Sequence, residues 1–117
     1  MIIRKKQIDA LGLYMVDQFV ERALVYLRTA FNKQMKDQSD DDLRTKIHAG
    51  IEKAKSYDIK YERDVLHFLE YIMRCGTDFD TDPQFIDGAK ILRQEIDGTA
   101  KILLLSEYIQ SSHKELI

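Results

Sequence analysis

A long stripe of apolar residues near the N-terminus is the first feature of the chain. Between about Lys6 and Phe31, apolar side chains recur at steps of three and four positions. The stripe comprises Ile8, Leu11, Met15, Phe19, Ala23, Tyr26 or Leu27, and Ala30. Because a helix turns once every 3.6 residues, this spacing places the set on one face. The pattern predicts a first helix over about residues 6–31.

A second apolar stripe follows a polar segment, residues 32–38. Ser39 is suited to cap a helix N-terminus, and the acidic residues 40–42 suit the positive end of a helix dipole. The stripe has a spacing of four and consists of Leu43, Ile47, Ile51 and Ala54. These signals predict a second helix that ends near residues 56–58, in which Gly50 permits close packing against a neighbour.

Three further helices are predicted from capping residues and apolar spacing. The third covers about residues 62–75, and Gly76 is placed to end it in a left-handed conformation. The fourth begins at Pro83 behind a capping Asp82, and its inward-facing residues are Phe85, Ala89 and Leu92. The last covers about residues 99–114 and carries Ile102, Leu103, Leu105, Tyr108 and Ile109.

Helix breakers are scarce, with one proline and five glycines among 117 residues, which favours helices over a many-stranded sheet. A chain of this length falls within the size range of one domain. Helices joined by short loops can bury their apolar stripes only against one another. We therefore expect an all-α fold, a compact bundle of about five helices in which residues 1–117 form a single domain.

The overall composition does not indicate which class of partner the protein binds. Hydrophobic residues make up 44% and charged residues 32% of the chain, as in folded globular proteins. The formal net charge of -2 gives no strong field that would attract nucleic acid. The single cysteine, Cys75, forms no intrachain disulfide and favours a reducing compartment, and no stretch has the pattern of a signal peptide or a membrane span. We expect a cytoplasmic protein with no membrane association.

The acidic segment 78–82, Asp-Phe-Asp-Thr-Asp, is the most distinctive candidate site. Its alternating carboxylates match the start of an EF-hand calcium loop. Such a loop needs a glycine at its sixth position and a glutamate at its twelfth, where this chain has Pro83 and Ala89. We therefore expect no metal. Asp82 is expected to cap the next helix, a further aspartate to make a side-chain turn within the loop, and Phe79 to enter the core.

The histidines and the cysteine give no catalytic motif. His67 and Glu70 lie three positions apart on the predicted third helix, but the residues that would complete a di-metal site are missing. Cys75 has no Cys–His signature, and the chain has no glycine-rich phosphate loop. The sequence predicts no catalytic residue and no cofactor. An enzyme would need His67, Cys75 and the loop carboxylates to meet in one pocket.

The predicted first helix is apolar around more of its circumference than a surface helix requires. Either the helix is central to the bundle, which is favoured, or part of it meets another chain. In the second case its extra apolar strip would contact a partner together with the acidic loop. The candidate partner-binding residues are Leu13, Val16, Val20, Leu24, Asp78, Phe79, Asp80 and Asp82.

Several short motifs occur in order along most of the chain: Ile3-Arg4-Lys5-x-Gln7, Gly50-Ile51-x-x-Ala54, Glu62-Arg63-Asp64-Val65, Gly76-x-Asp78-Phe79-Asp80-x-Asp82-Pro83 and Ile91-Leu92. This order resembles a family of short, all-helical bacterial accessory proteins encoded beside effector genes of type VI secretion and other polymorphic-toxin loci. The chain departs from that pattern at Tyr61, where a Ser or Thr cap is expected, and near Asp87, where an aromatic residue is expected. The resemblance implies a cytoplasmic chaperone, adaptor or immunity protein that binds a secreted effector or toxin.

We therefore expect a non-enzymatic protein-interaction module that binds an effector or toxin, or a second copy of itself as a homodimer. The alternative is a small nucleic-acid-binding regulator that uses the basic residues Arg4 to Lys6 and a helix. A second basic group, Arg28, Lys33 and Lys36, is closely followed by acidic residues, which makes nucleic acid the less favoured partner. Salt-dependent binding to DNA or RNA distinguishes the two hypotheses.

Overall fold

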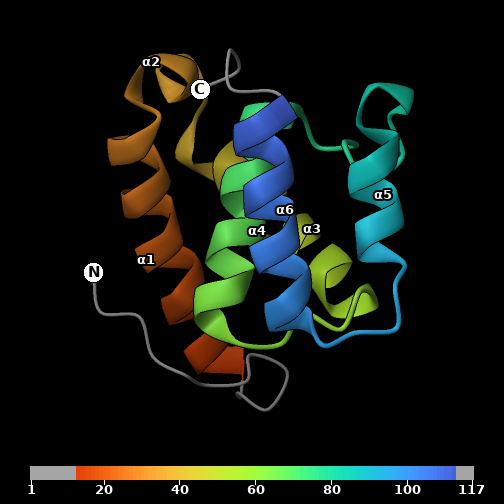
Figure 1. The fold of residues 1–117 in the computed structure, drawn as a ribbon. Helices are drawn as coiled ribbons and strands as arrows, with labels where there is room; N and C mark the ends of the chain where they lie inside the picture. The colour runs from red at the N-terminus through yellow and green to blue at the C-terminus, as the bar shows by residue number, and fades with distance from the viewer. Residues whose placement is uncertain (1–12, 113–117) are drawn as a thin grey trace.

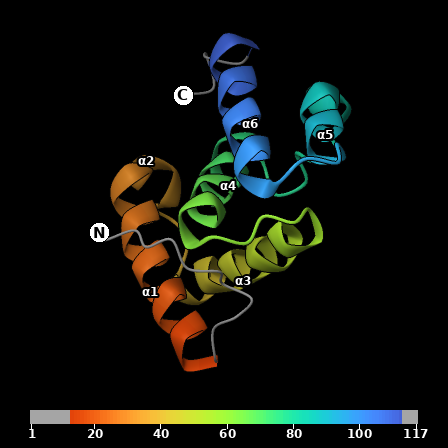
Figure 2. The ribbon, with the colours of Figure 1, turned by 60° about the horizontal axis from the view of Figure 1, so that its bottom comes forward.

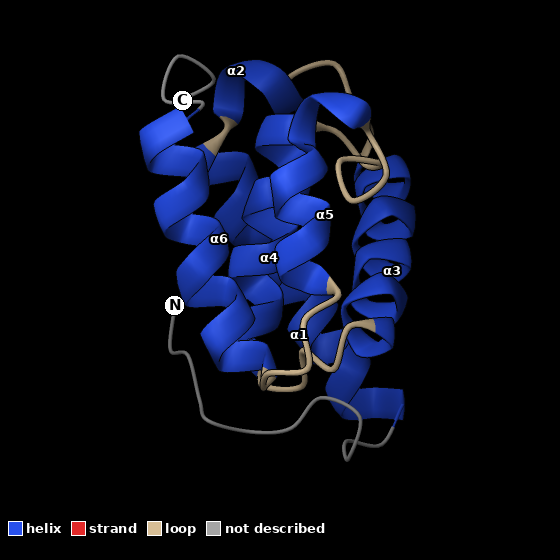
Figure 3. Cartoon of the chain, turned by 45° about the vertical axis from the view of Figure 1, so that its right-hand side comes forward, coloured by secondary structure: helices blue, strands red, loops and turns tan. Residues whose placement is uncertain are grey.

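The computed structural model of the chain describes residues 13–112, which form α-helices and one 3₁₀ turn (Figure 1). The elements are α1 (Leu13–Ala30), α2 (Asn32–Met35), α3 (Asp40–Ser56), α4 (Glu62–Cys75), the 3₁₀ turn η2 (Pro83–Phe85), α5 (Ile86–Leu92) and α6 (Gly98–Ser112). Figure 3 shows these helices joined by short loops. The predicted all-α fold is therefore confirmed. The predicted beginning of the first helix, residues 6–12, lies outside the described residues.

The short helix α2 lies in the polar segment where no helix was predicted. Its Met35 side chain is buried in the core. Arg28 of α1 donates to the carbonyl oxygens of Met35 and Gln38 at 3.0 and 2.6 Å, where the chain turns back toward α3. The Met35 carbonyl also accepts from the backbone N–H of Gln38 at 3.1 Å, so the guanidinium adds a second bond at the end of α2 and one to Gln38, three residues beyond it. A contact between two separate elements therefore fixes α2, and apolar spacing alone does not reveal it.

Helix α4 is at the centre of the fold and contacts α1, α3 and α6. Helix α5 packs against α6 and η2, so that α1 and α5 lie on opposite sides of the pair α4 and α6 (Figures 1 and 2). Buried side chains point in several directions from α4, among them Val65, Leu66, Phe68, Leu69 and Ile72. The most completely covered helix is therefore α4, and α1 lies at one side of the bundle.

The predicted caps at two element starts are confirmed. The Ser39 hydroxyl accepts a hydrogen bond from the backbone N–H of Asp42 at 3.1 Å, which begins α3. The Asp82 carboxylate accepts from the backbone N–H of Gln84 at 2.9 Å. This cap begins the 3₁₀ turn η2, which leads into α5, and Pro83 is its first residue. At the start of α4, Tyr61 makes no side-chain capping bond.

Gly50 and Gly76 have different structural roles. A Cβ atom at Gly50 would lie 2.5 Å from Leu69 Cδ2, so the glycine allows α3 to approach α4 closely, as predicted. Gly76 ends α4 with φ of 105° and ψ of 154°, and its N–H donates to the carbonyl of Ile72 at 2.9 Å. The positive φ requires glycine, but the ψ value is extended. The predicted left-handed cap is therefore wrong in its second dihedral angle, and the chain leaves α4 in an extended direction.

A row of aromatic rings fills the core between α4 and η2. Phe79 is buried between Phe68 and Phe85, with ring centroids 5.7 and 6.4 Å away. The predicted insertion of Phe79 into the core is thus confirmed, as is the burial of Phe85, Ala89 and Leu92. Leu103 of α6, in contrast, is 62% exposed. Within the described part of the chain, no helix is long and apolar enough to cross a membrane.

Candidate protein-binding face

Two hydrogen bonds join one side of α1 to α4. Arg22 Nη2 donates to Glu62 Oε2 at 2.6 Å, and the Tyr26 hydroxyl donates to Glu70 Oε1 at 2.7 Å. Arg22 and Tyr26 are four positions apart, so they lie on the same side of α1. The Glu62 side chain is almost fully buried, whereas Arg22 is about one third exposed. The pair therefore places a half-exposed guanidinium at the edge of the contact between the two helices.

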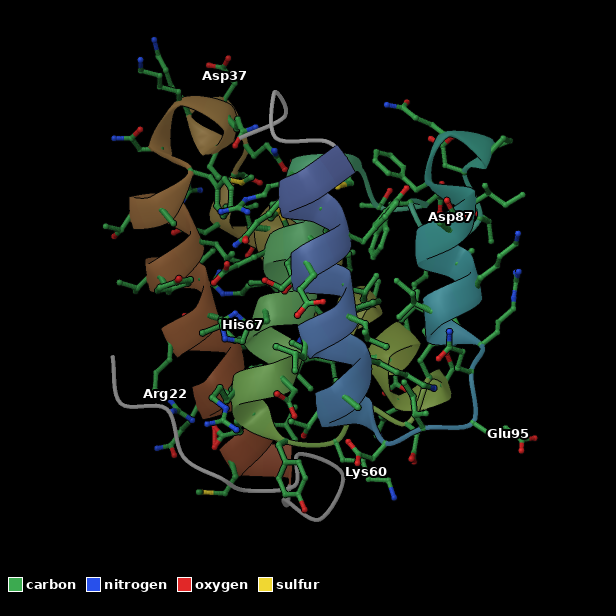
Figure 4. The ribbon with its side chains drawn as sticks, viewed as in Figure 1. Arg22, Asp37, Lys60, His67, Asp87 and Glu95 are labelled. Carbon is green, nitrogen blue, oxygen red and sulfur yellow. The ribbon has the colours of Figure 1, made fainter. Side chains whose placement is uncertain are left out.

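Glu70 contacts both Tyr26 and a histidine through the same oxygen atom, Oε1. Its carboxylate lies 3.8 Å from His67 Nδ1, and Figure 4 shows His67 on the side of α4 that faces α1. The hydrogen bond to Glu70, together with burial and the charge of Glu70, raises the pKa of Tyr26 to about 12. Tyr26 therefore stays protonated at neutral pH and remains a donor to Glu70.

Arg74, one helical turn beyond Glu70, has an unusual environment. Its Cζ lies 5.7 Å from the centroid of the Phe31 ring, which is a cation–π arrangement. The Nε atom is shielded from solvent and makes no hydrogen bond. None of the ion pairs in the described part of the chain involves Arg74. A half-buried guanidinium is thus held by an aromatic ring and lacks a carboxylate partner.

Two hollows adjoin these side chains. The first has a volume of about 540 Å³ and is lined by Glu21, Arg22, Val25, Tyr26 and Thr29. The second has a volume of about 420 Å³, and among its lining residues are Tyr26, Phe31, Lys33, Gln34, Glu70 and Arg74. Tyr26 lines both hollows, so the two hollows adjoin each other, and we call the surface that they form together the Tyr26 face. At its apolar end, Val25 is 66% exposed.

A third hollow, of about 660 Å³, lies where α6 begins, and Asp58, Tyr61, Thr99 and Leu103 are among its lining residues. Buried polar contacts fix its walls. The Thr99 hydroxyl donates to Asp64 Oδ2 at 2.5 Å, and Lys101 Nζ donates to the carbonyl of Tyr57 at 2.7 Å. Lys60 and Asp58, which also line this hollow, pair with each other at 3.1 Å, so its charged groups are engaged within the protein.

The predicted apolar strip of α1 lies largely in the core. Val20 and Leu24 are 1% and 5% exposed, and Val16 is half-buried. The side chain of Leu13 lies outside the described residues. Because α1 packs against both α3 and α4, two flanks of the helix are covered. The prediction that Val20 and Leu24 meet a partner from an exposed strip is therefore wrong, whereas Val25, next to Leu24 in the chain, is exposed.

The acidic loop is likewise more buried than predicted. Asp80 is 4% exposed and accepts hydrogen bonds from Lys53 Nζ at 2.9 Å and from the Tyr57 hydroxyl at 2.7 Å. A side-chain turn of a further aspartate within the loop was expected. Asp80 instead bonds to Lys53 of α3 and to Tyr57, the residue that follows α3. Phe79 is in the core and Asp82 caps η2, so Asp78 is the most exposed of the predicted loop residues.

These contacts set the ionisation of the buried pair. Burial raises the pKa of Asp80, but the hydrogen bonds from Tyr57 and Lys53 outweigh it, and the pKa of Asp80 lies below its ordinary value. Burial and the hydrogen bond to Asp80 raise the pKa of Tyr57 to about 12. At neutral pH the carboxylate is therefore charged and the phenol is neutral, which is the combination that the hydrogen bond requires.

The two halves of the predicted binding surface are not brought together. The loop 78–82 packs against the end of α3 and leads to α5, whereas α1 lies on the other side of α4 and α6 (Figures 1 and 2). The Tyr26 face was not predicted from the sequence. The available signal was the spacing of Arg22, Val25, Tyr26 and Thr29, which places aromatic, apolar and charged side chains on one side of a helix.

The residues of the enzymatic alternative are also dispersed. His67 faces α1, whereas Cys75 is half-buried at the far end of α4, and neither lines any of the three hollows. Burial raises the pKa of the Cys75 thiol, which disfavours the thiolate. Among the described residues, no three His, Cys, Asp or Glu side chains are grouped so that they could hold a metal ion.

The basic residues that the nucleic-acid-binding alternative would use differ in their surroundings. Arg4 to Lys6 lie outside the described residues. Arg28 donates to Asp40 Oδ1 at 2.7 Å as well as to the two carbonyls near α2, so its guanidinium is used within the protein. Lys33 and Lys36 are exposed. The described structure therefore shows no continuous basic patch around Arg28.

Comparisons of the chain with protein-family models, with curated proteins and with solved structures give no match.

Proposed function

We propose that the protein is a non-enzymatic interaction module that binds another protein through the Tyr26 face. The observation that carries the proposal is the combination of an exposed Val25 in one hollow with Phe31 and Arg74 in the adjoining hollow, both of which are lined by Tyr26. Tyrosine and arginine are enriched among the residues that dominate binding energy at protein interfaces. An apolar centre with a charged rim is the usual arrangement of such interfaces.

The rigidity of the face supports this role. Tyr26 is held by Glu70, Arg22 by Glu62 and the guanidinium of Arg74 by the ring of Phe31. Side chains that are already fixed lose little conformational entropy when a partner binds. The side chains of the face are therefore preorganised for binding.

The class of partner that we propose is a secreted effector or toxin, with the protein acting in the cytoplasm as its chaperone, adaptor or immunity factor. The support is the resemblance carried by the motifs of the sequence, of which Gly76-x-Asp78-Phe79-Asp80-x-Asp82-Pro83 is the most distinctive. The burial of Phe79 and Asp80 gives that motif a structural purpose. The loop therefore stabilises the fold, and partner binding is assigned to the Tyr26 face.

The experiment is co-purification of the tagged full chain with the product of the adjacent gene, using two matched variants. Val25→Glu places a charge at the apolar end of the face, and Ile86→Glu places one at a residue of α5 that is 56% exposed. Both positions are solvent-exposed, so both variants are expected to fold. We expect Val25→Glu to lose the complex and Ile86→Glu to keep it.

Other outcomes of this experiment contradict the proposal. A complex that survives Val25→Glu but not Ile86→Glu would place the interface on α5. Recovery of a lone monomer in every case would contradict an interaction module. Self-association that is lost in Val25→Glu would identify a second copy of the chain as the partner. Binding to DNA that weakens steeply with added salt and ignores Val25→Glu would favour the nucleic-acid-binding regulator.

A further inference from the structure

Arg74 differs from the other arginines that join elements of this fold. Arg22 donates to Glu62, Arg28 to Asp40 and Arg44 to Glu21, each over 2.6 to 2.7 Å. Arg74 is half-buried, and its contact is the ring of Phe31. Moving a guanidinium away from water without a carboxylate partner costs free energy. The free protein therefore carries a cation whose usual partner is absent from the described residues.

We propose that the hollow at Arg74 binds an acidic side chain of the partner protein, and that an apolar residue of the same partner segment covers Val25. This inference rests on the proposed function, because it names the chemistry that the Tyr26 face recognises. Phe31 fixes the position of the guanidinium, whose planar group is suited to a carboxylate. The two hollows share Tyr26, so a single segment can occupy both.

The charges around the hollow agree with a carboxylate ligand. Lys33, which is exposed, lines the same hollow and adds a second positive charge. Glu70 is the carboxylate that lines it, and its Oε1 accepts from the Tyr26 hydroxyl and lies 3.8 Å from His67. In the neighbouring hollow, Glu21 is bonded to Arg44 at 2.7 Å. Both carboxylates are thus engaged elsewhere, and the positive charges of Arg74 and Lys33 face the hollow.

A protein segment fits this surface better than a nucleic acid does. The end of the face at Val25 is apolar, and Glu21 and Glu70 border the two hollows. A polyphosphate chain would have to pass these carboxylates, and the net charge of -2 gives it no general attraction. A partner segment with one acidic side chain and an apolar neighbour needs a positive charge at one end of its site and an exposed aliphatic surface at the other. Arg74 and Val25 provide these two features.

The test uses peptides selected from a displayed random library, roughly 16 residues long, against the purified full chain. Peptides whose binding is abolished by Val25→Glu are kept, because they bind the Tyr26 face. Each is synthesised in its selected form and with every Asp and Glu replaced, one at a time, by Asn or Gln. Their dissociation constants are measured on the wild-type protein, on Arg74→Gln and on the control Arg93→Gln, whose exposed arginine lies at the end of α5.

We expect one acidic position per peptide at which neutralisation weakens binding to the wild type by about tenfold. Arg74→Gln should weaken the unmodified peptide by a similar factor. In combination, the two changes should cause little further loss, because each removes the same ion pair. Arg93→Gln should bind every peptide as the wild type does.

The remaining outcomes separate this inference from the function on which it rests. Peptides that require Val25 but tolerate both neutralisation and Arg74→Gln would overturn the acidic ligand and leave the binding face intact. If no selected peptide is sensitive to Val25→Glu, the binding face fails together with the acidic ligand. Circular dichroism of Arg74→Gln distinguishes a lost contact from a lost fold.

Discussion

Tyr57 and Tyr26 each donate a hydrogen bond to a carboxylate at 2.7 Å, but the two carboxylates have different surroundings. Tyr57 bonds to Asp80, which also accepts from Lys53 at 2.9 Å, and Lys53 donates in turn to the carbonyl of Thr77 at 2.9 Å. We call Tyr57, Asp80 and Lys53 the Asp80 cluster. Its carboxylate is 4% exposed and its cation is paired, so no strong polar group is left for a partner.

Tyr26, Glu70 and Arg74 contain the same three kinds of group, and we call them the Glu70 cluster. Here the carboxylate side chain is 12% exposed, and the Arg74 guanidinium lies over Phe31 without joining the pair of Glu70 and His67. The closed arrangement at Asp80 ties the acidic loop to α3, whereas the open arrangement at Glu70 leaves a cation at a concave surface. This contrast agrees with a stabilising role for the first cluster and with the binding role that we propose for the second.

Removing the two carboxylates should have the largest and most unequal effects. Asp80→Ala leaves the Tyr57 hydroxyl and one Lys53 bond without a partner in a buried region, so we expect a loss of about 3 kcal/mol in the free energy of unfolding. Glu70→Ala removes a more exposed acceptor, and we expect a loss of about 1 kcal/mol. Urea unfolding measures both. Equal losses would contradict the division between a closed and an open cluster.

The tyrosine hydroxyls give a smaller test of the same contrast. Tyr57→Phe should cost about 1.5 kcal/mol because it leaves a buried, charged carboxylate with one donor fewer. Tyr26→Phe should cost about 1 kcal/mol or less, since water can reach Glu70 in place of the hydroxyl. Thermal unfolding of the two variants measures which of them loses more stability. A larger loss for Tyr26→Phe would reverse the assignment of the two clusters.

Lowering the pH should reduce the free energy of unfolding through the Asp80 cluster, by less than the substitutions above do. The pKa of Asp80 lies below its ordinary value of 3.8, so its contribution to stability is present above about pH 4 and is lost as the pH falls below that value. Asp80→Asn has no charge to lose at this position. We expect its free energy of unfolding to fall less than that of the wild type between about pH 5 and about pH 3. An equal fall in both proteins would show that other carboxylates carry the acid dependence.

Much of the fold could be predicted because its signals are local. The side chain of Ser39 accepts from the backbone N–H three positions further along, and the side chain of Asp82 accepts from the N–H two positions further along. The apolar stripes identify the buried faces of α3 and α4. Helix α2 could not be found in this way, because Arg28 bonds its terminal carbonyls from another element. The burial of Val20 and Leu24 was missed for a related reason. Spacing shows that a helix is apolar but not how many neighbours cover it.

The candidate site could not be predicted because its contacts join distant positions. Tyr26 and Glu70 are 44 residues apart, and Asp80 is 27 residues from Lys53. The sequence marked the acidic loop as distinctive, but no local pattern shows that Asp80 is turned inward. The same residue types therefore form a structural cluster where a binding site was expected, and the face that we propose for binding lies where none was predicted.

The stability of Arg74→Met, compared with Lys53→Met, tests the central claim most directly. Methionine keeps much of the aliphatic stem in each case and removes the charge. Because Arg74 has no carboxylate partner among residues 13–112, we predict that Arg74→Met changes the free energy of unfolding by less than about 0.5 kcal/mol, or raises it, whereas Lys53→Met lowers it by about 2 kcal/mol or more. A loss in Arg74→Met as large as that in Lys53→Met would show that Arg74 serves the fold, and would contradict its assignment to a partner.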